Sequence, residues 1–145
     1  MSILLKNASP AEVHALIDFL QKVNLPTSDL PSDLSGFTLA FDGNEIVGSA
    51  GLELLGILGL LRSVAVAETH RDQQLGQQLF AAALDYARSH EVQEVFLITN
   101  TADRYFAKKG FQELERSQVP DEIAQTEQFS GLCPSTAVVM KMRLN

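Results

Sequence analysis

Apolar and polar residues alternate in blocks along the chain, and the spacing within each block predicts a strand or a helix. Short, bounded apolar runs predict strands at residues 3–6, 37–41, 45–54, 60–67, 95–99, 111–116 and 135–144. Apolar residues that recur at three- and four-residue steps predict helices over 10–23 and 74–89, with shorter helical segments over 102–109 and 120–128. This order of elements indicates an α/β (α+β) fold.

Turn and capping residues set the boundaries of several elements. The pair Asp42-Gly43 lies between two strand-like runs and is a strong hairpin signal. The second, third and fourth strands should therefore form an antiparallel meander. Ser9 and Glu12 have the spacing of a capping box at a helix start. The fifth strand follows a helix, so it should lie parallel to the fourth after a right-handed crossover. Residues 24–36 are predicted to form a loop.

The composition is that of a soluble, single-domain protein. The 145 residues suggest one domain over residues 1–145, large enough to bury a sizeable core. The net charge of −7 disfavours a broad surface for nucleic acid or anionic membrane. No apolar stretch approaches the roughly 20 residues of a membrane span. Cys133 is the one cysteine, so no internal disulfide can form and a cytoplasmic location is expected.

The stretch from residue 60 to 88 is the main candidate for a ligand site. Its pattern predicts a buried strand, a polar loop over 68–74 and then a helix. The first amides of a helix have no internal acceptor, so an anion such as a phosphate suits them. Arg71 adds a full positive charge to the loop. The alternative is an ordinary strand–loop–helix unit without a ligand.

Two motifs in the chain resemble the GNAT superfamily of N-acetyltransferases. The first resembles the family's coenzyme A (CoA) loop, whose pattern is Gln or Arg, two residues, Gly, one residue, then Gly or Ala. It runs here from Arg71 to Gly76, and Gln74 replaces the first glycine. If the loop needs a left-handed residue there, Gln74 costs roughly 1–2 kcal/mol. The second motif, Asn100 followed by YFAKKGF at 105–111, resembles the family's Asn…Phe-Tyr-x-Lys-x-Gly-Phe segment.

A closer resemblance is to the arsenic-resistance N-acetyltransferase subfamily. The segments that carry it are FSGLCPSTAV at 129–138, LRS at 61–63 and GLE at 51–53. The Leu-Cys-Pro part, just before the last strand, is the most specific. This resemblance suggests an amino-acid-like or arsenical acceptor.

The predicted order of elements is also that of the GNAT family. The resemblance implies a mixed central sheet of six to seven strands flanked by about four helices. It implies transfer of the acetyl group of acetyl-CoA, as co-substrate, to the amine of a small molecule by direct attack in a ternary complex. Family members often pair through their C-terminal strands, so a homodimer is one expectation. The alternative is a non-catalytic relative that binds CoA or a small ligand as a sensor, because Gln74 and Phe106 depart from the family pattern.

The family holds CoA between its fourth and fifth strands and on the loop that follows the fourth. Two strands that splay apart leave backbone groups unpaired, and the amide units of a pantetheine arm can fill the gap. One amide there can also bind the thioester oxygen as negative charge grows on it. By resemblance, the cofactor-binding residues are Val64, Ala65, Val66, Arg71, Asp72, Gln73, Gln74, Leu75, Gly76, Gln77, Asn100 and Phe106.

Two residues are candidates for proton transfer. Glu53 is an acid in an otherwise apolar strand, so it either faces solvent or acts as the base that deprotonates the acceptor amine. The family often uses a tyrosine to reprotonate the departing thiolate. Its usual position is Phe106 here, and Tyr105 stands one residue earlier, which turns the side chain by about 100° on a helix. A thiolate can also leave without an acid, because the pKa of a thiol is already near 8.5.

Arg62, Ser63 and Cys133 are the candidates for substrate binding. The two-residue period of a strand puts Arg62 on one face with Leu60 and Val64. There it could hold an anionic carboxylate of the acceptor or pair with Glu53. Cys133 could be a nucleophile, a soft ligand for trivalent arsenic or a small buried hydrophobe. The histidines have no metal-ligand spacing, so no metal is expected.

Overall fold

The computed structural model describes residues 3–25, 27–28, 30–31, 33–99, 102–126 and 137–144, except for the side chains of Asp72 and Gln73. The strands are β1 Ile3–Asn7, β2 Phe37–Asp42, β3 Glu45–Leu55, β4 Leu58–Val66, β5 Glu94–Thr99, β6 Gln112–Leu114 and β7 Val138–Arg143. The α-helices are α1 Val13–Lys22, α2 Leu75–Ser89, α3 Asp103–Lys108 and α4 Asp121–Ala124. Short 3-10 helices are η1 Pro10–Glu12, η2 Glu68–Gln73 and η3 Arg116–Gln118.

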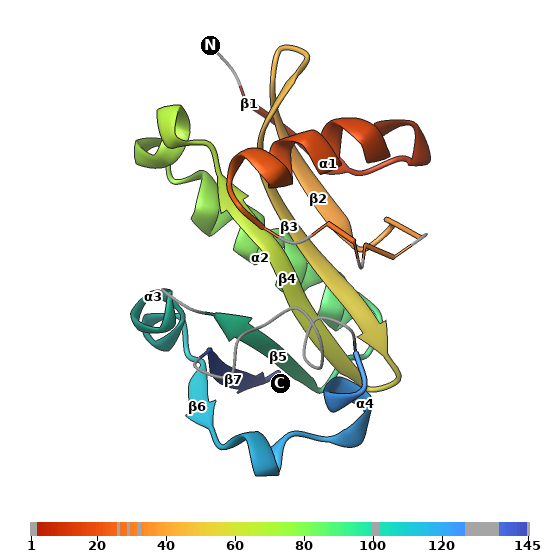
Figure 1. Ribbon diagram of the computed structural model, residues 1–145, viewed down its shortest axis with the longest axis vertical. Helices are drawn as coiled ribbons and strands as arrows, with labels where there is room; N and C mark the ends of the chain where they lie inside the picture. Colours follow the sequence, from red (N-terminus) through yellow and green to blue (C-terminus); the bar gives the residue numbers. More distant parts are fainter. Residues whose placement is uncertain are drawn as a thin grey trace.

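The strands form one mixed sheet in the order β1-β2-β3-β4-β5-β7-β6. The predicted meander is confirmed, because β2–β3 and β3–β4 pair antiparallel. The predicted parallel pairing of β4 with β5 is confirmed as well. Seven strands and four α-helices in the described part of the chain match the expected mixed sheet and its helical layers (Figure 1).

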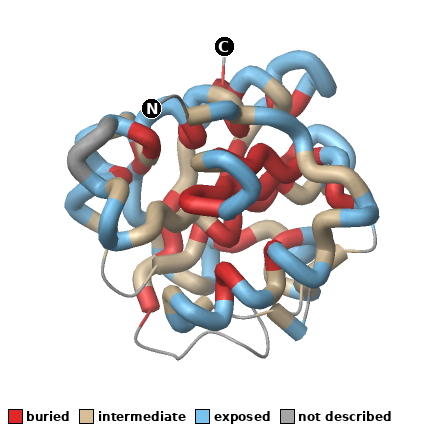
Figure 2. Tube along the Cα trace, turned by 90° about the horizontal axis from the view of Figure 1, so that it is seen from above, coloured by how far each residue is buried: buried red, intermediate tan, exposed pale blue. Residues whose placement is uncertain are grey.

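Helices cover both faces of the sheet. On one face, α1 packs Leu16 and Phe19 against Leu39 of β2, and α4 packs Ile123 against Leu60 of β4. On the other face, the apolar stripe of α2 packs on the alternate residues of β2, β3 and β4, whose side chains point the opposite way. Figure 1 shows α1 in front of the sheet and α2 behind it. The buried positions gather along the middle of the molecule in Figure 2, where a buried sheet is expected.

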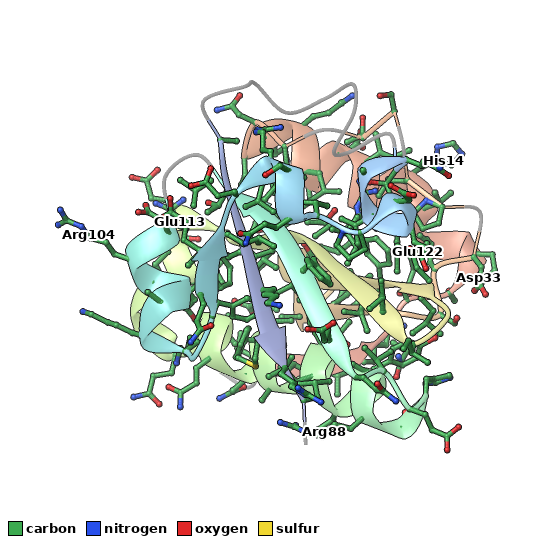
Figure 3. All side chains as sticks on the ribbon, turned by 90° about the horizontal axis from the view of Figure 1, so that it is seen from below. His14, Asp33, Arg88, Arg104, Glu113 and Glu122 are labelled. Carbon is green, nitrogen blue, oxygen red and sulfur yellow. The ribbon has the colours of Figure 1, made fainter. Side chains whose placement is uncertain are left out.

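Charged side chains surround this core. The residues labelled in Figure 3 are all exposed and point outward from the helices, loops and edge strand that carry them: His14, Asp33, Arg88, Arg104, Glu113 and Glu122. Among the described residues, no helix is long and apolar enough to cross a membrane.

Several boundaries differ from the predicted ones for local reasons. The predicted start near Ser9 is confirmed, since its amide donates to Glu12 Oε1 at 2.8 Å, but η1 precedes the α-helix proper. The turn between β3 and β4 takes only residues 56–57, so β4 begins at Leu58 instead of residue 60. The predicted loop 68–74 contains η2, and the predicted sixth strand shortens to three residues.

Candidate functional site

β4 and β5 pair only at their N-terminal ends. The parallel register runs from Leu58↔Glu94 to Leu60↔Phe96 and then stops, although β4 continues to Val66 and β5 to Thr99. The two ribbons spread apart toward α3 in Figure 1. Residues are fully buried along the paired part of β4 but only half-buried from residue 64 to 66. This half-burial is unusual for a central strand, and it leaves residues 64–66 partly accessible where the strands diverge.

A β-bulge in β4 lies at the start of the diverging part. Gly51 pairs with Arg62, whereas Ser49 pairs with Ala65, so β4 has one extra residue there. Ser63 adopts a left-handed conformation with φ of 55°. The hydroxyl of the fully buried Ser49 donates to the Ser63 carbonyl at 2.6 Å and fixes the bulge from β3. Sequence reasoning did not find Ser49, because its partner is 14 residues away and no local signal marks the bulge.

The bulge corrects one prediction about the face of β4. Leu60 packs in the cluster under α4, whereas Val64 packs against the cluster under α2. The prediction that Arg62 shares a face with both Leu60 and Val64 is therefore right for Leu60 and wrong for Val64. An extra residue in one strand reverses the alternation of side chains beyond it.

The loop after β4 presents the beginning of α2. Gln74 is left-handed, with φ of 60° and ψ of 21°, and α2 starts at the next residue. The amide of Gln78 bonds to the Gln74 carbonyl at 3.3 Å and is the first amide of α2 with an intrahelical bond. The amides of residues 75–77 therefore have no acceptor within the helix. Arg71 Nε donates to the Val66 carbonyl at 3.3 Å, which joins the loop to the last residue of β4. This arrangement suits an anion at the helix N-terminus.

An interaction between His70 and Asp42 also holds this loop. His70 Nε2 lies 2.9 Å from Asp42 Oδ2, and His70 Nδ1 lies 2.7 Å from Thr69 Oγ1. The contact ties η2 to the β2–β3 turn, 28 positions earlier in the chain. No local pattern predicts this pairing, because the two residues meet only in the folded sheet. Two neighbouring residues, His70 and Arg71, thus anchor the loop that offers the helix amides.

Because Gln74 is left-handed, exchanging it for glycine should stabilise the fold. The left-handed conformation costs a side-chain-bearing residue about 1–2 kcal/mol, and glycine avoids this cost. Part of the gain in stability is lost, because glycine also gives the unfolded chain more conformational freedom. We expect Gln74→Gly to raise the free energy of unfolding by about 0.5–1 kcal/mol in urea denaturation. The control Gln78→Gly lies in regular helix and should lower it by a similar amount. Equal destabilisation by both changes would contradict this reading.

Glu53 and Arg62 form an ion pair across β3 and β4. Arg62 Nη1 lies 2.6 Å from Glu53 Oε1, and the side chains are 1% and 22% exposed, respectively. Arg62 Nε also donates to Ser63 Oγ at 3.2 Å. Of the two alternatives for Arg62, the structure contains the pairing with Glu53. The three side chains thus meet beside the bulge, with the carboxylate as the most accessible of them.

Tyr105 and Phe106 occupy different surroundings on α3. Phe106 is 6% exposed and packs its ring against Phe80 and Phe111, at centroid distances of 6.2 and 5.7 Å. Tyr105 is 39% exposed, and partial burial raises the pKa of its hydroxyl above the usual value of 10.0. Its Oη lies 3.5 Å from the position that a Cβ on Gly76 would take. The tyrosine hydroxyl is therefore at the beginning of α2.

Some predicted site residues lie outside the described part of the chain. These are Asn100, Cys133 and the side chains of Asp72 and Gln73. A groove of about 540 Å³ lies against η2, between the end of α1 and the β2–β3 turn. Its lining includes Lys22, Glu45 and Arg71 but no residue of β5. This groove is distinct from the place where β4 and β5 diverge.

Comparisons with known proteins agree with this geometry. The sequence model of the acetyltransferase (GNAT) family matches residues 8–111. The amino-acid acetyltransferase of Mycobacterium tuberculosis is 32% identical over 92 residues, which cover 63% of this chain and 49% of that relative. The match thus spans about half the length of the curated relative.

Solved structures share the fold at low sequence identity. N-acetylglutamate synthase from Neisseria gonorrhoeae, complexed with coenzyme A and N-acetyl-glutamate, superposes with a TM-score of 0.81 at 19% identity. The similarity covers 100% of this chain and 36% of that one. A GNAT-family acetyltransferase from Staphylococcus aureus MU50 has a TM-score of 0.79 at 19% identity, over 99% of this chain and 100% of that one. Since the family match covers more than half of the sequence, the chain belongs to the acetyltransferase (GNAT) family.

Proposed function

We propose that this chain transfers the acetyl group of acetyl-CoA to the amine of a small molecule by direct attack in a ternary complex, within one GNAT domain over residues 1–145. The observation that carries the proposal is the early end of the β4–β5 register, which leaves residues 64–66 half-buried in the middle of a sheet. Acetyl-CoA supplies an activated thioester, and the residues around the diverging strands bind it and orient the acceptor.

The backbone of β4 and the loop after it would hold the donor. Val64, Ala65 and Val66 offer backbone groups beside the gap, and a pantetheine arm can pair with them as an added strand does. The loop 71–77 would hold the pyrophosphate through the amides of residues 75–77 at the start of α2. By family resemblance, Asn100 would reach the pantetheine and Phe106 would support the site through the packing of α3. An amide of the bulge, next to Ser63, is the proposed donor to the thioester oxygen.

Glu53, Arg62 and Ser63 would serve the acceptor. The amine must be neutral to attack, so Glu53 would accept its proton, directly or through one water. The amine nitrogen then bonds to the carbonyl carbon, and the carbon–sulfur bond breaks to release CoA as its thiolate. The extra proton on the new amide nitrogen passes to that thiolate or to water. The Arg62 guanidinium stays paired with the carboxylate at 2.6 Å and so fixes its orientation beside the bulge. Ser63 Oγ, bonded to Arg62, would complete the substrate-facing polar group.

An amino-acid-like amine is the proposed class of acceptor. The support is the similarity to a curated amino-acid acetyltransferase and to a structure complexed with N-acetyl-glutamate. An arsenic-containing amine is the narrower proposal, and it rests on the segments at 51–53, 61–63 and 129–138. Cys133, within the last of these, would contact that acceptor.

Calorimetry followed by a thiol-release assay tests the function. We expect the protein to bind CoA and acetyl-CoA, and to release thiol with at least one member of a panel of amino acids, polyamines and an arsenic-containing amine. Binding without turnover on any amine would favour the sensor alternative. A folded protein that binds neither CoA nor acetyl-CoA would contradict the proposal.

A further inference from the structure

The hydroxyl of Tyr105 lies where the first turn of α2 meets the end of β4. A Cβ built on Gly76 would be 3.5 Å from Tyr105 Oη and 3.8 Å from Val66 Cγ2. Gly76 is the second residue of α2, and Val66 is the last residue of β4. The hydroxyl therefore lies close to Gly76, beside the amides that the proposed function assigns to pyrophosphate.

This position is far from the point where the thioester would react. The bulge at Ser63 lies three residues before Val66, which is at most about 10 Å along an extended strand. A proton donor must come within about 3 Å of the sulfur or reach it through a single water. A hydroxyl at the beginning of α2 does not meet that condition for a sulfur beside the bulge.

The surroundings of Tyr105 suit a donor to a phosphate. Its hydroxyl makes no hydrogen bond with the residues that the structure describes. It stays protonated at neutral pH, because the ordinary pKa of a tyrosine hydroxyl is near 10 and burial raises that of Tyr105 further. Lys109 Nζ lies 5.4 Å from the centre of the ring and adds positive charge on the same side of α3. A neutral hydroxyl thus lies beside the unpaired amides of a helix start, and a lysine lies over the ring that carries it.

We propose that Tyr105 donates a hydrogen bond to the diphosphate portion of CoA and so selects the full donor over thioesters that lack phosphate. The proposal rests on the proposed function and changes the part that Tyr105 plays in it, from acid for the thiolate to specificity determinant for the donor. The thiolate then leaves without a side-chain acid, as its low pKa permits.

Acetyl donors with and without phosphate distinguish a tyrosine that binds phosphate from one that acts as the acid. Tyr105→Phe removes the hydroxyl and keeps the ring, and we expect KM for acetyl-CoA and Kd for CoA to rise about tenfold with kcat unchanged, as for loss of a hydrogen bond to a charged group. With S-acetyl-pantetheine, which has no phosphate, the variant should match the unaltered protein. Tyr86→Phe is the control, since its hydroxyl contacts Ser35 Oγ at 3.2 Å instead.

The possible results separate the role proposed for Tyr105 from the proposed acetyltransferase function. If Tyr105→Phe lowers kcat with both acetyl donors, or removes the alkaline limb of the pH profile, Tyr105 acts as the acid. Either result would overturn its proposed role as a donor to phosphate. Unchanged KM and Kd for the CoA donors in a folded Tyr105→Phe protein would overturn it as well. If the unaltered protein binds no CoA, the proposed function itself fails, whatever the variant does.

Discussion

Replacing Gly76 with tryptophan should lower the affinity for CoA at least hundredfold. The indole would occupy the space between Tyr105 and Val66, above the first amides of α2, and would cover the site assigned to pyrophosphate. A hundredfold loss corresponds to about 2.7 kcal/mol of binding free energy. The measurement is isothermal titration calorimetry with CoA on protein whose folding is checked by circular dichroism.

Gly76→Ala is the matched control for this change. A methyl group at that position meets Tyr105 Oη at 3.5 Å, which is ordinary van der Waals contact. The alanine variant should therefore keep CoA affinity within about threefold, well under 1 kcal/mol. A folded Gly76→Trp protein that binds CoA as tightly as the alanine variant would remove the helix N-terminus from the site.

Replacing Glu53 with leucine should destabilise the fold by about 3 kcal/mol. The change leaves the buried Arg62 guanidinium without its carboxylate, and breaking a buried pair from one side costs roughly 3–5 kcal/mol. We expect the low end, because Glu53 is partly exposed and Arg62 keeps its contact with Ser63. Urea denaturation measures the change.

A double variant tests whether the pair itself is responsible. Arg62→Met added to Glu53→Leu removes both charges, so it should recover at least half of the lost stability. The exposed pair Asp85–Arg88, with oxygen and nitrogen 3.5 Å apart, is the control. Asp85→Ala should change the free energy of unfolding by less than about 0.5 kcal/mol. If Glu53→Leu behaves like Asp85→Ala, the pair is not structurally important.

Most of the fold could be predicted because its signals are local. The Asp42-Gly43 turn, the helix start at Ser9 and the periodic stripe of α2 are each contained in one short segment. The alternation of side chains also set the face of Leu60 and Arg62, because nothing interrupts the strand between them.

The details of the site could not be predicted because they depend on distant partners. Ser63 is left-handed although it is not glycine, and the buried Ser49 hydroxyl of another strand stabilises that conformation. Likewise, His70 finds Asp42 only when the β2–β3 turn and η2 are folded side by side. The family pattern puts the tyrosine at position 106, so the sequence offered Tyr105 only as a displaced candidate for the acid. The packing of α3 against Gly76 is what puts its hydroxyl at the start of α2.

CoA is expected to bind where β4 and β5 diverge and on the helix start that follows. Titrating isotope-labelled protein with CoA and following backbone amide resonances tests it most directly. We predict that the amides of residues 64–66 and 75–77 shift in one saturable process, while those of β1 and β2 stay in place. Saturable binding that moves only amides around the groove between α1 and the β2–β3 turn, and leaves residues 64–66 unchanged, would contradict the account.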